Sequence, residues 1–272
     1  MSTLKFPRNG LTLVSLFAGC GGSSLGYKMA GYDVRLAVEW DSKAVATYRA
    51  NFPETPIYEG DIGLLQGEEA LHLAGMHSGE LNVLDGSPPC QGFSMAGKRQ
   101  FTDRRNRLFE EYVRLLQVFQ PRAFIMENVS GLIKGKMKLT FAEMTRNLKA
   151  SGYRVSCRLL NAWWYGVPQD RRRLFWIGIR NDLQIEPSYP VPTCREPITV
   201  AQALKMKGTA LEKWSGTQRW YQEGIVPTLA AVRPPHIREY HQPQVVEAWL
   251  VAKPGQSLRR ARHDVGSLQS IR

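Results

Sequence analysis

The sequence has few cysteines and no long apolar run, and both shortages exclude classes of protein. Its 272 residues include four cysteines, which lie far apart and form no CxxC pair. A disulfide framework or a zinc site is therefore not expected, and we predict no metal. No apolar run reaches the ~20 residues that a membrane span needs, and the first residues, MSTLKFPRNG, lack the apolar core of a signal peptide. We expect a cytoplasmic protein with no membrane partner.

Acidic residues are outnumbered by basic ones. Lys and Arg total 36 against 24 Asp and Glu, a formal net charge of +12. Such a chain suits a polyanion, most often nucleic acid, although the charge alone fits a soluble basic protein equally well. The distribution favours nucleic acid, because GKRQFTDRRNR (97–107) directly follows a candidate nucleophile, Cys90, and DRRR (170–173) forms a second basic cluster.

Apolar runs alternate with helical patterns through the first two thirds of the chain. Seven runs read as strands: 11–19, 32–41, a short run ending near 59–62, 81–90, 123–131, 153–162 and 172–180. Four stretches between them read as helices: 25–31, which Ser23 or Ser24 would cap, 42–52, 107–120 and 138–152. This alternation predicts an α/β fold with a doubly wound, mostly parallel, Rossmann-like sheet.

The pattern dissolves after about residue 181, where EPSYPVPTCREP reads as a proline-rich linker. We therefore predict a catalytic domain over 1–185 and an irregular, partial target-recognition region over 186–272.

Several polar or glycine residues follow predicted strands, where ligands of such sheets bind. The FAGCGG turn (17–22) is not the GxGxxG fingerprint, and a simple tight turn is the commoner explanation of such a sequence. Glu39 follows Gly19 by twenty residues, a spacing typical of an acid that binds ribose hydroxyls. Trp40 offers a flat face to an adenine ring, and Asp61 could accept from an exocyclic amine. Together these residues indicate a nucleoside cofactor without a pyrophosphate.

Cys90 stands in DGSPPCQGFS, after two prolines that remove amide donors and fix the backbone. A free cysteine is usually a small buried apolar residue, but this loop is suited to presenting one side chain, and the thiolate is a strong nucleophile. No histidine lies nearby in the sequence, so a protease-like Cys–His pair is not expected. Glu127 ends an apolar strand and is either a solvated carboxylate or a proton donor. Arg171 and Arg173 would share one face of an extended chain.

FAGCGG, SPPCQGFS, ENV and QDRRR occur in this order between residue 11 and about residue 180, and they resemble the ordered motifs of the cytosine-C5 DNA methyltransferases. The resemblance implies a Rossmann-like methyltransferase fold and methyl transfer from S-adenosylmethionine to C5 of a flipped-out cytosine in duplex DNA. It assigns the covalent attack on C6 to Cys90, protonation of N3 to Glu127, and the hold on the cytosine to Arg171 and Arg173.

The resemblance also implies two sets of binding residues. The expected cofactor residues are Phe17, Gly19, Gly21, Glu39, Trp40, Asp61, Ile62, Pro89 and Leu108. The expected DNA residues are Gln91, Ser94, Lys98, Arg99, Arg104, Arg105 and Gln169, several of them in a loop that closes over DNA.

The sequence departs from the family after QDRRR. Members continue with an RxxTxxExxRLQxFP motif and a final helix with a GNS signature, and neither is present. We therefore expect the larger subunit of a split enzyme, working as a heterodimer with a second polypeptide, or else a C-terminally truncated member. Bacterial restriction-modification is the expected setting. A transfer-RNA cytosine methyltransferase and a non-catalytic regulatory half are the alternatives. The Cys-Phe-Thr element usual in the RNA enzymes is absent, since Cys194 stands in PTCREP.

Overall fold

The structure is a computed structural model that describes residues 6–89, 107–135, 137–196, 198, 203 and 226–227. Cys90 and six of the predicted DNA residues lie outside the described residues: Gln91, Ser94, Lys98, Arg99, Arg104 and Arg105. Within the described ranges no helix is both long and apolar enough to cross a bilayer, and no three His, Cys, Asp or Glu side chains gather as metal ligands would.

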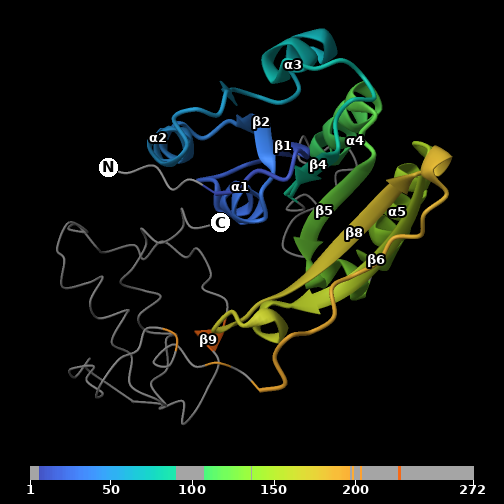
Figure 1. Cartoon of the computed structure of the whole chain (residues 1–272). Helices are drawn as coiled ribbons and strands as arrows, with labels where there is room; N and C mark the ends of the chain where they lie inside the picture. Colours follow the sequence, from blue (N-terminus) through green and yellow to red (C-terminus); the bar gives the residue numbers. More distant parts are fainter. Residues whose placement is uncertain are drawn as a thin grey trace, which may run out of the picture. The chain divides into compact units, whose positions relative to one another are not determined.

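Seven strands form one sheet, seen from its side in Figure 1. They are β1 (Thr12–Leu16), β2 (Asp33–Glu39), β3 (Ile57–Glu59), β4 (Val83–Gly86), β5 (Ala123–Val129), β6 (Tyr153–Asn161) and β8 (Arg172–Arg180), in the spatial order β3-β2-β1-β4-β5-β8-β6. β1 to β5 pair in parallel, whereas β8 runs antiparallel to β5. The predicted fold class, a mostly parallel α/β sheet, is confirmed, and each of the seven predicted strands is present.

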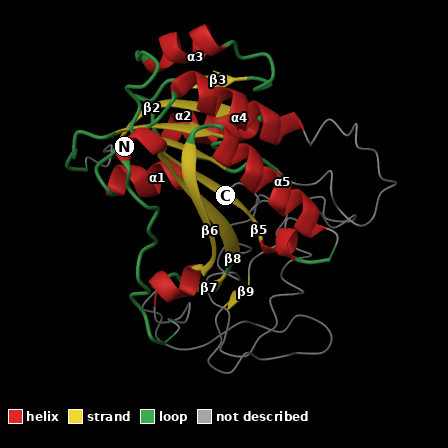
Figure 2. Ribbon diagram, turned by 90° about the vertical axis from the view of Figure 1, so that its right-hand side faces the viewer, coloured by secondary structure: helices red, strands yellow, loops and turns green. Residues whose placement is uncertain are grey.

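Helices cover both faces of the sheet (Figure 2). They are α1 (Gly22–Met29), α2 (Ser42–Asn51), α3 (Gly67–Ala74), α4 (Arg107–Phe119) and α5 (Met137–Ala150), joined by the short helices η2 (Ser130–Ile133), η3 (Ala162–Tyr165) and η4 (Asn181–Leu183). α3, α4 and α5 share one large apolar core with alternate residues of the strands, and α1 and α2 pack in smaller clusters on the opposite face. The result is a three-layer sandwich.

The apolar spacing of α4 explains why it forms a helix against the sheet. Tyr112, Leu115, Leu116 and Phe119 recur at helical intervals and are fully buried. Burial of each such side chain contributes about 1.5–3 kcal/mol relative to exposure. The helix ends before Pro121, which cannot continue it.

α3 was not predicted from the sequence. Its eight residues, GEEALHLA, are too few for helical periodicity to be distinct. The helix forms because Ala70 and Ala74 are buried in the large core, and it stops at Gly75, whose φ is 61°.

The predicted cap of α1 is wrong. Gly21, in the left-handed region, is the N-cap and makes no side-chain cap bond. The two serines are used elsewhere, because the Ser23 hydroxyl donates to Asp85 and the Ser24 hydroxyl accepts from Tyr48. α2 has an ordinary cap, in which Asp41 accepts from the backbone N–H groups of Lys43 and Ala44.

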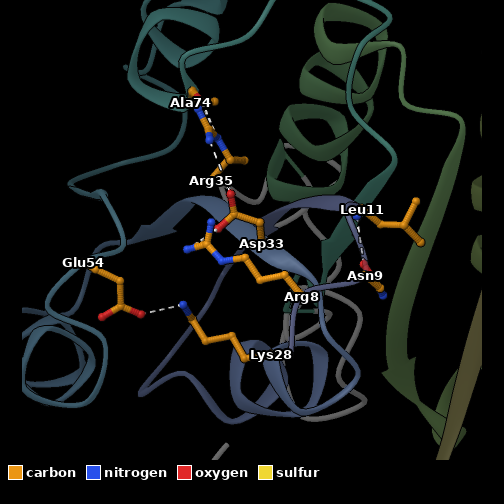
Figure 3. Close-up of polar contacts among 8 residues, drawn as sticks. All are labelled: Arg8, Asn9, Leu11, Lys28, Asp33, Arg35, Glu54 and Ala74. Carbon is orange, nitrogen blue, oxygen red and sulfur yellow. Dashed lines mark hydrogen bonds and ion pairs between the residues drawn. The ribbon is translucent and has the colours of Figure 1, made fainter. Parts of the chain in front are cut away.

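Ion pairs connect the segment before β1 to the start of β2, and α1 to the residues after α2 (Figure 3). Arg8 lies 3.6 Å from Asp33, which also pairs with Arg35 at 3.3 Å, and Arg35 Nε donates to the Ala74 carbonyl of α3. Lys28 of α1 pairs with Glu54 at 2.7 Å. Most of these side chains are partly exposed, so each pair contributes only about 0–1 kcal/mol.

The described chain divides into two compact units. The first contains the residues up to Leu159 together with Arg173–Tyr189, and the second contains Leu160–Arg172 and continues from Pro190. In the second, β7 (Gln169–Asp170) pairs in parallel with β9 (Val226–Pro227). The predicted domain boundary after residue 185 stays a prediction.

The first residues of the predicted linker contact strands of the first unit, and the boundary between the two units falls within the linker, after Tyr189. Glu186 pairs with Arg154 of β6 at 3.0 Å, and the Tyr189 hydroxyl donates to the Phe175 carbonyl of β8 at 3.0 Å. The Arg158 guanidinium also lies over the Tyr189 ring, 4.9 Å from its centroid. These contacts hold the stretch against the first unit.

Candidate active site

The turn between β1 and α1 has a left-handed backbone at three positions. Phe17 has a φ of 56°, Gly19 of 55° and Gly21 of 92°. Gly21 is also required by packing, because a Cβ there would lie 2.5 Å from Cε2 of Phe52 and 2.9 Å from Cδ2 of Tyr48. The glycines therefore allow a tight turn whose backbone a ligand can approach closely.

The Glu39 carboxylate closes this turn. Its Oε2 accepts from the Gly19 N–H at 2.8 Å, and its Oε1 accepts from the N–H groups of Trp40 and Asp41 at 2.9 and 3.0 Å. Glu39 is only 8% exposed, so the carboxylate has a single fixed orientation at the end of β2. Oε2 accepts a single hydrogen bond and so keeps a lone pair for a ligand hydroxyl, whereas both lone pairs of Oε1 are used. The neighbouring Trp40 is 77% exposed and presents an open aromatic surface.

The remaining predicted cofactor residues of the parallel strands and α4 differ in exposure. Asp61 is exposed after β3, and its Oδ1 accepts from the Gly63 N–H at 2.9 Å. Ile62 is 4% exposed and belongs to the large core, so its side chain is part of the scaffold. Leu108, near the start of α4, is half-buried against the same core.

The base of the cysteine loop is fastened to β5 by a residue that the sequence interpretation passed over. Asn128 Nδ2 donates to the Pro88 carbonyl at 3.0 Å, and its Oδ1 accepts from the Val129 N–H at 2.8 Å. Asn128 is 4% exposed and Pro88 is buried, whereas Pro89 is exposed. The amide therefore fixes the backbone two residues before Cys90. Its signal was available, since Asn128 is the middle residue of the ENV motif.

Glu127 and Arg173 form an ion pair. Arg173 Nε lies 2.9 Å from Glu127 Oε1, and their side chains are 18% and 23% exposed. The antiparallel register of β5 and β8 explains this proximity, because Glu127 stands opposite Phe175 and Arg173 opposite Val129. A largely desolvated guanidinium–carboxylate pair is a strong, directional contact, so the carboxylate is oriented before any substrate binds.

Gln169 and Arg171 belong to the second unit. Gln169 lies in β7, and its carbonyl accepts from the Arg171 N–H at 3.0 Å. The Arg171 carbonyl accepts from the Ala162 N–H at 3.0 Å. Both side chains are half-buried in this compact loop.

A buried carboxylate, Asp85 of β4, lies beneath the turn and was not singled out from the sequence. It is 8% exposed and accepts hydrogen bonds from the hydroxyls of Ser15, Ser23 and Tyr27. Burial raises the pKa of Asp85 from 3.8 to about 6, although the three hydroxyls lower it, and the Glu127 charge adds to the rise. No local sequence pattern indicates this cluster, because its partners come from β1 and α1.

The first unit thus brings most of the predicted residues to one edge of the sheet. The turn at 17–21, Glu39, Asp61, Pro89 and Glu127 each lie at or just after the carboxyl end of one of the five parallel strands. This is where ligands of open α/β sheets bind.

A family model described as "C-5 cytosine-specific DNA methylase" matches residues 11–243 of the chain. Among curated proteins, a Type II methyltransferase of Haemophilus parahaemolyticus, M1.HphI, is 42% identical over 71% of this chain and 52% of its own length. M.XorII of Xanthomonas oryzae is 41% identical over 70% of this chain and 45% of its own. The chain spans about half the length of these relatives. M.AquIA of a Picosynechococcus strain is 36% identical over 82% of this chain and 90% of its own length.

Solved structures agree on the fold. A crystal structure described as a DNA modification methyltransferase encoded within an E. coli prophage has a TM-score of 0.63 and 32% identity, and covers 79% of this chain and 61% of that one. The DNMT2 protein of Spodoptera frugiperda matches with a TM-score of 0.52 and 24% identity, over 82% of this chain and 61% of its own, which is a likeness of fold alone.

Proposed function

Since this chain belongs to the C-5 cytosine-specific DNA methylase family, we propose that it transfers a methyl group from S-adenosylmethionine to C5 of a cytosine flipped out of duplex DNA. Flipping is required because C6 and C5 cannot be reached inside the base stack. The net charge of +12 suits the phosphate backbone of the substrate. The relatives named Type II methyltransferases suggest a restriction-modification setting, which implies a cytoplasmic enzyme.

The residues at the carboxyl edge fit S-adenosylmethionine, a nucleoside without phosphates. Oε2 of the fixed Glu39 carboxylate has a lone pair for a ribose hydroxyl, and the exposed Trp40 ring and Phe17 suit the adenine. Asp61 suits the exocyclic amine, and the glycine turn leaves the backbone open. When bound, the cofactor supplies an electrophilic methyl group.

The covalent step is assigned to Cys90. Its thiolate would add to C6 and make C5 nucleophilic, and C5 would then form a bond to the methyl carbon of the cofactor as the S–CH3 bond breaks and S-adenosylhomocysteine leaves. Loss of the C5 proton to a base, cleavage of the C–S bond and return of the N3 proton to Glu127 would then restore the thiolate and release methylcytosine. Glu127 protonates N3 during the attack, so negative charge does not accumulate on the ring. Arg173 orients Glu127 and, with Arg171, holds the base.

The observation that carries this proposal is the pair of anchors around the cysteine loop. Asn128 holds the Pro88 carbonyl, and the adjacent residue Glu127 is held by Arg173. The acid and Pro88, two residues before Cys90 in the sequence, are therefore fastened to the same strand, which supports the action of Glu127 and Cys90 on one base.

The test measures transfer of labelled methyl groups to duplex DNA and to transfer RNA by the wild-type chain, Cys90→Ser and the matched control Cys157→Ser. Cys157 lies half-buried in β6, where burial raises its thiol pKa to about 12, so its loss should not matter. We expect activity on DNA that only Cys90→Ser abolishes. DNA with 5-fluorocytosine should trap a covalent adduct, because fluorine blocks loss of the C5 proton. Activity of Cys90→Ser, or methylation of RNA alone, would contradict the proposal.

A second polypeptide that supplies the RLQ-type and GNS segments stays a prediction. If it exists, the 272-residue chain should methylate DNA poorly by itself. Addition of a polypeptide with those segments should restore activity and tighten cofactor binding. Full sequence-specific activity of the chain alone would refute the heterodimer.

A further inference from the structure

Asp85 connects two parts of the candidate site that are far apart in sequence. It lies on β4, five positions before Cys90, and its hydroxyl partners stand on β1 and on the first two turns of α1. Ser23 directly follows the glycine turn and donates to Oδ2, and Tyr27, one turn later, donates to Oδ1 at 3.2 Å.

The strand that carries Asp85 is itself immobilised. Gly86 packs so closely that a Cβ there would lie 2.8 Å from Cε2 of Tyr112 and 3.3 Å from Cβ of Leu16. Beyond it, Asn128 holds the Pro88 carbonyl. The Asp85 carboxylate is therefore a fixed point at the base of the cysteine loop.

The start of α1 packs against α2 through Gly21 and Ser24, but it has no side-chain cap. Its N-cap is Gly21, which makes no side-chain cap bond, and both Gly22 and Ser23 are exposed. The Ser23 hydroxyl is thus a link from this open first turn to the fixed strand. Burying a carboxylate is costly unless hydrogen bonds compensate, and the two bonds from α1 supply part of that compensation while they locate the helix.

We propose that Asp85 is a positioning residue that couples the cofactor-side turn to the base of the cysteine loop by fixing the first turn of α1 to β4. The glycine turn at 17–21 then has the correct position to bind the cofactor. This inference rests on the proposed methyl transfer only for the identity of its ligand.

The test compares Ser23→Ala and Tyr27→Phe, which each break one link between Asp85 and α1, with the matched control Ser15→Ala. Ser15 also donates to Asp85, at 3.3 Å, but belongs to β1, the direct neighbour of β4 in the sheet. Because hydrogen bonds to charged groups are stronger than neutral ones, we expect the two α1 variants to weaken S-adenosylmethionine binding by roughly tenfold in calorimetric titration. They should raise the KM for cofactor and leave the KM for DNA unchanged, and Ser15→Ala should leave cofactor affinity at the wild-type value.

A second readout needs no ligand. Amide hydrogen exchange at Leu25, whose N–H donates to the Gly21 carbonyl at 2.8 Å, should accelerate in Ser23→Ala and not in Ser15→Ala. Wild-type affinity and exchange in Ser23→Ala, or an equal loss of affinity in Ser15→Ala, would overturn the proposal while methyl transfer by the wild-type chain still stands. If the wild-type chain binds no cofactor, the proposed function fails, and unchanged exchange in Ser23→Ala would overturn the positioning role separately.

Discussion

The buried Asp85 should make the stability of the protein depend on pH in a way that Asp85→Asn removes. Its pKa lies at about 6 in the folded chain against an ordinary value of 3.8, and desolvation is the largest cause. A carboxyl group whose pKa is raised by folding stabilises the folded state fully below the unfolded pKa. That contribution is lost as the pH rises through the folded pKa. Asparagine has nearly the same shape and does not titrate in this range.

The size of the effect follows from the two pKa values. The interval from 3.8 to about 6, at about 1.4 kcal/mol for each pH unit, corresponds to about 3 kcal/mol in full. Between about pH 4.5 and pH 7.5 roughly 2 kcal/mol of this is lost, because Asp85 is partly ionised in the unfolded chain at the lower pH. The difference in free energy of unfolding, wild type minus Asp85→Asn, should therefore fall by about that amount over this range.

Urea denaturation of both proteins at a series of pH values measures this difference, and subtraction removes the groups that they share. Asp182→Asn is the control: Asp182 is exposed, and its pKa is lowered by the hydrogen bond from Arg180. A carboxylate whose pKa is lowered by folding loses its stabilising contribution only as the pH falls below its ordinary pKa. The difference in free energy of unfolding between wild type and Asp182→Asn should therefore stay constant between about pH 5 and pH 7.5. The reasoning is refuted if the free energy of unfolding of wild type minus that of Asp85→Asn stays constant or grows with pH. Such a result would show that the hydrogen bonds from the hydroxyls offset or outweigh the effect of desolvation on the pKa of Asp85.

Three further substitutions test the site and its scaffold. Glu127→Gln should slow single-turnover methyl transfer at saturating DNA by ~10²–10⁴-fold. The control, Glu111→Gln, removes the ion pair to Arg114 on α4 and should leave this rate unchanged. If Glu127→Gln changed only the affinity for DNA, the result would count against the acid role. Asn128→Ala leaves the buried Pro88 carbonyl without its donor. The free energy of unfolding, measured by thermal denaturation, should therefore fall by about 1–3 kcal/mol, and turnover should be reduced. Unchanged turnover would argue against the role of Asn128 as an anchor. Gly21→Ala should destabilise the folded protein by more than about 2 kcal/mol, because Gly21 has a φ of 92° and an added Cβ would lie 2.5 Å from Cε2 of Phe52. Gly26 has open space around it, so Gly26→Ala should stabilise the folded protein by up to about 1 kcal/mol. Equal effects of the two substitutions would contradict the packing argument.

Much of the fold and the candidate site was predictable because the relevant signals are local. Alternating apolar runs and helical spacing indicated all seven strands of the sheet and four helices, including α4 with its apolar stripe at Tyr112, Leu115 and Phe119. The turn at Phe17 and the ENV motif can be identified within a few residues, and Glu39 can be identified by its spacing of twenty residues from Gly19. Since the carboxyl ends of parallel strands share one edge of the sheet, the sequence alone also predicted that Glu39, Asp61 and Glu127 lie along that edge.

Other features depend on residues that meet only when the chain folds. Asp85 receives hydroxyl donors from Ser15 and Ser23, which are 70 and 62 positions away in sequence, and Asn128 reaches Pro88 across 40 positions. The pairing of Glu127 with Arg173 follows from the antiparallel register of β8 against β5. Hydrogen bonds and ion pairs depend on the distance between atoms in space, and the periodicity of a sequence does not specify that distance. These contacts could therefore be identified only from the tertiary structure. The same reason explains α3 and the redirected serines of α1, where burial against distant strands outweighed weak local preference.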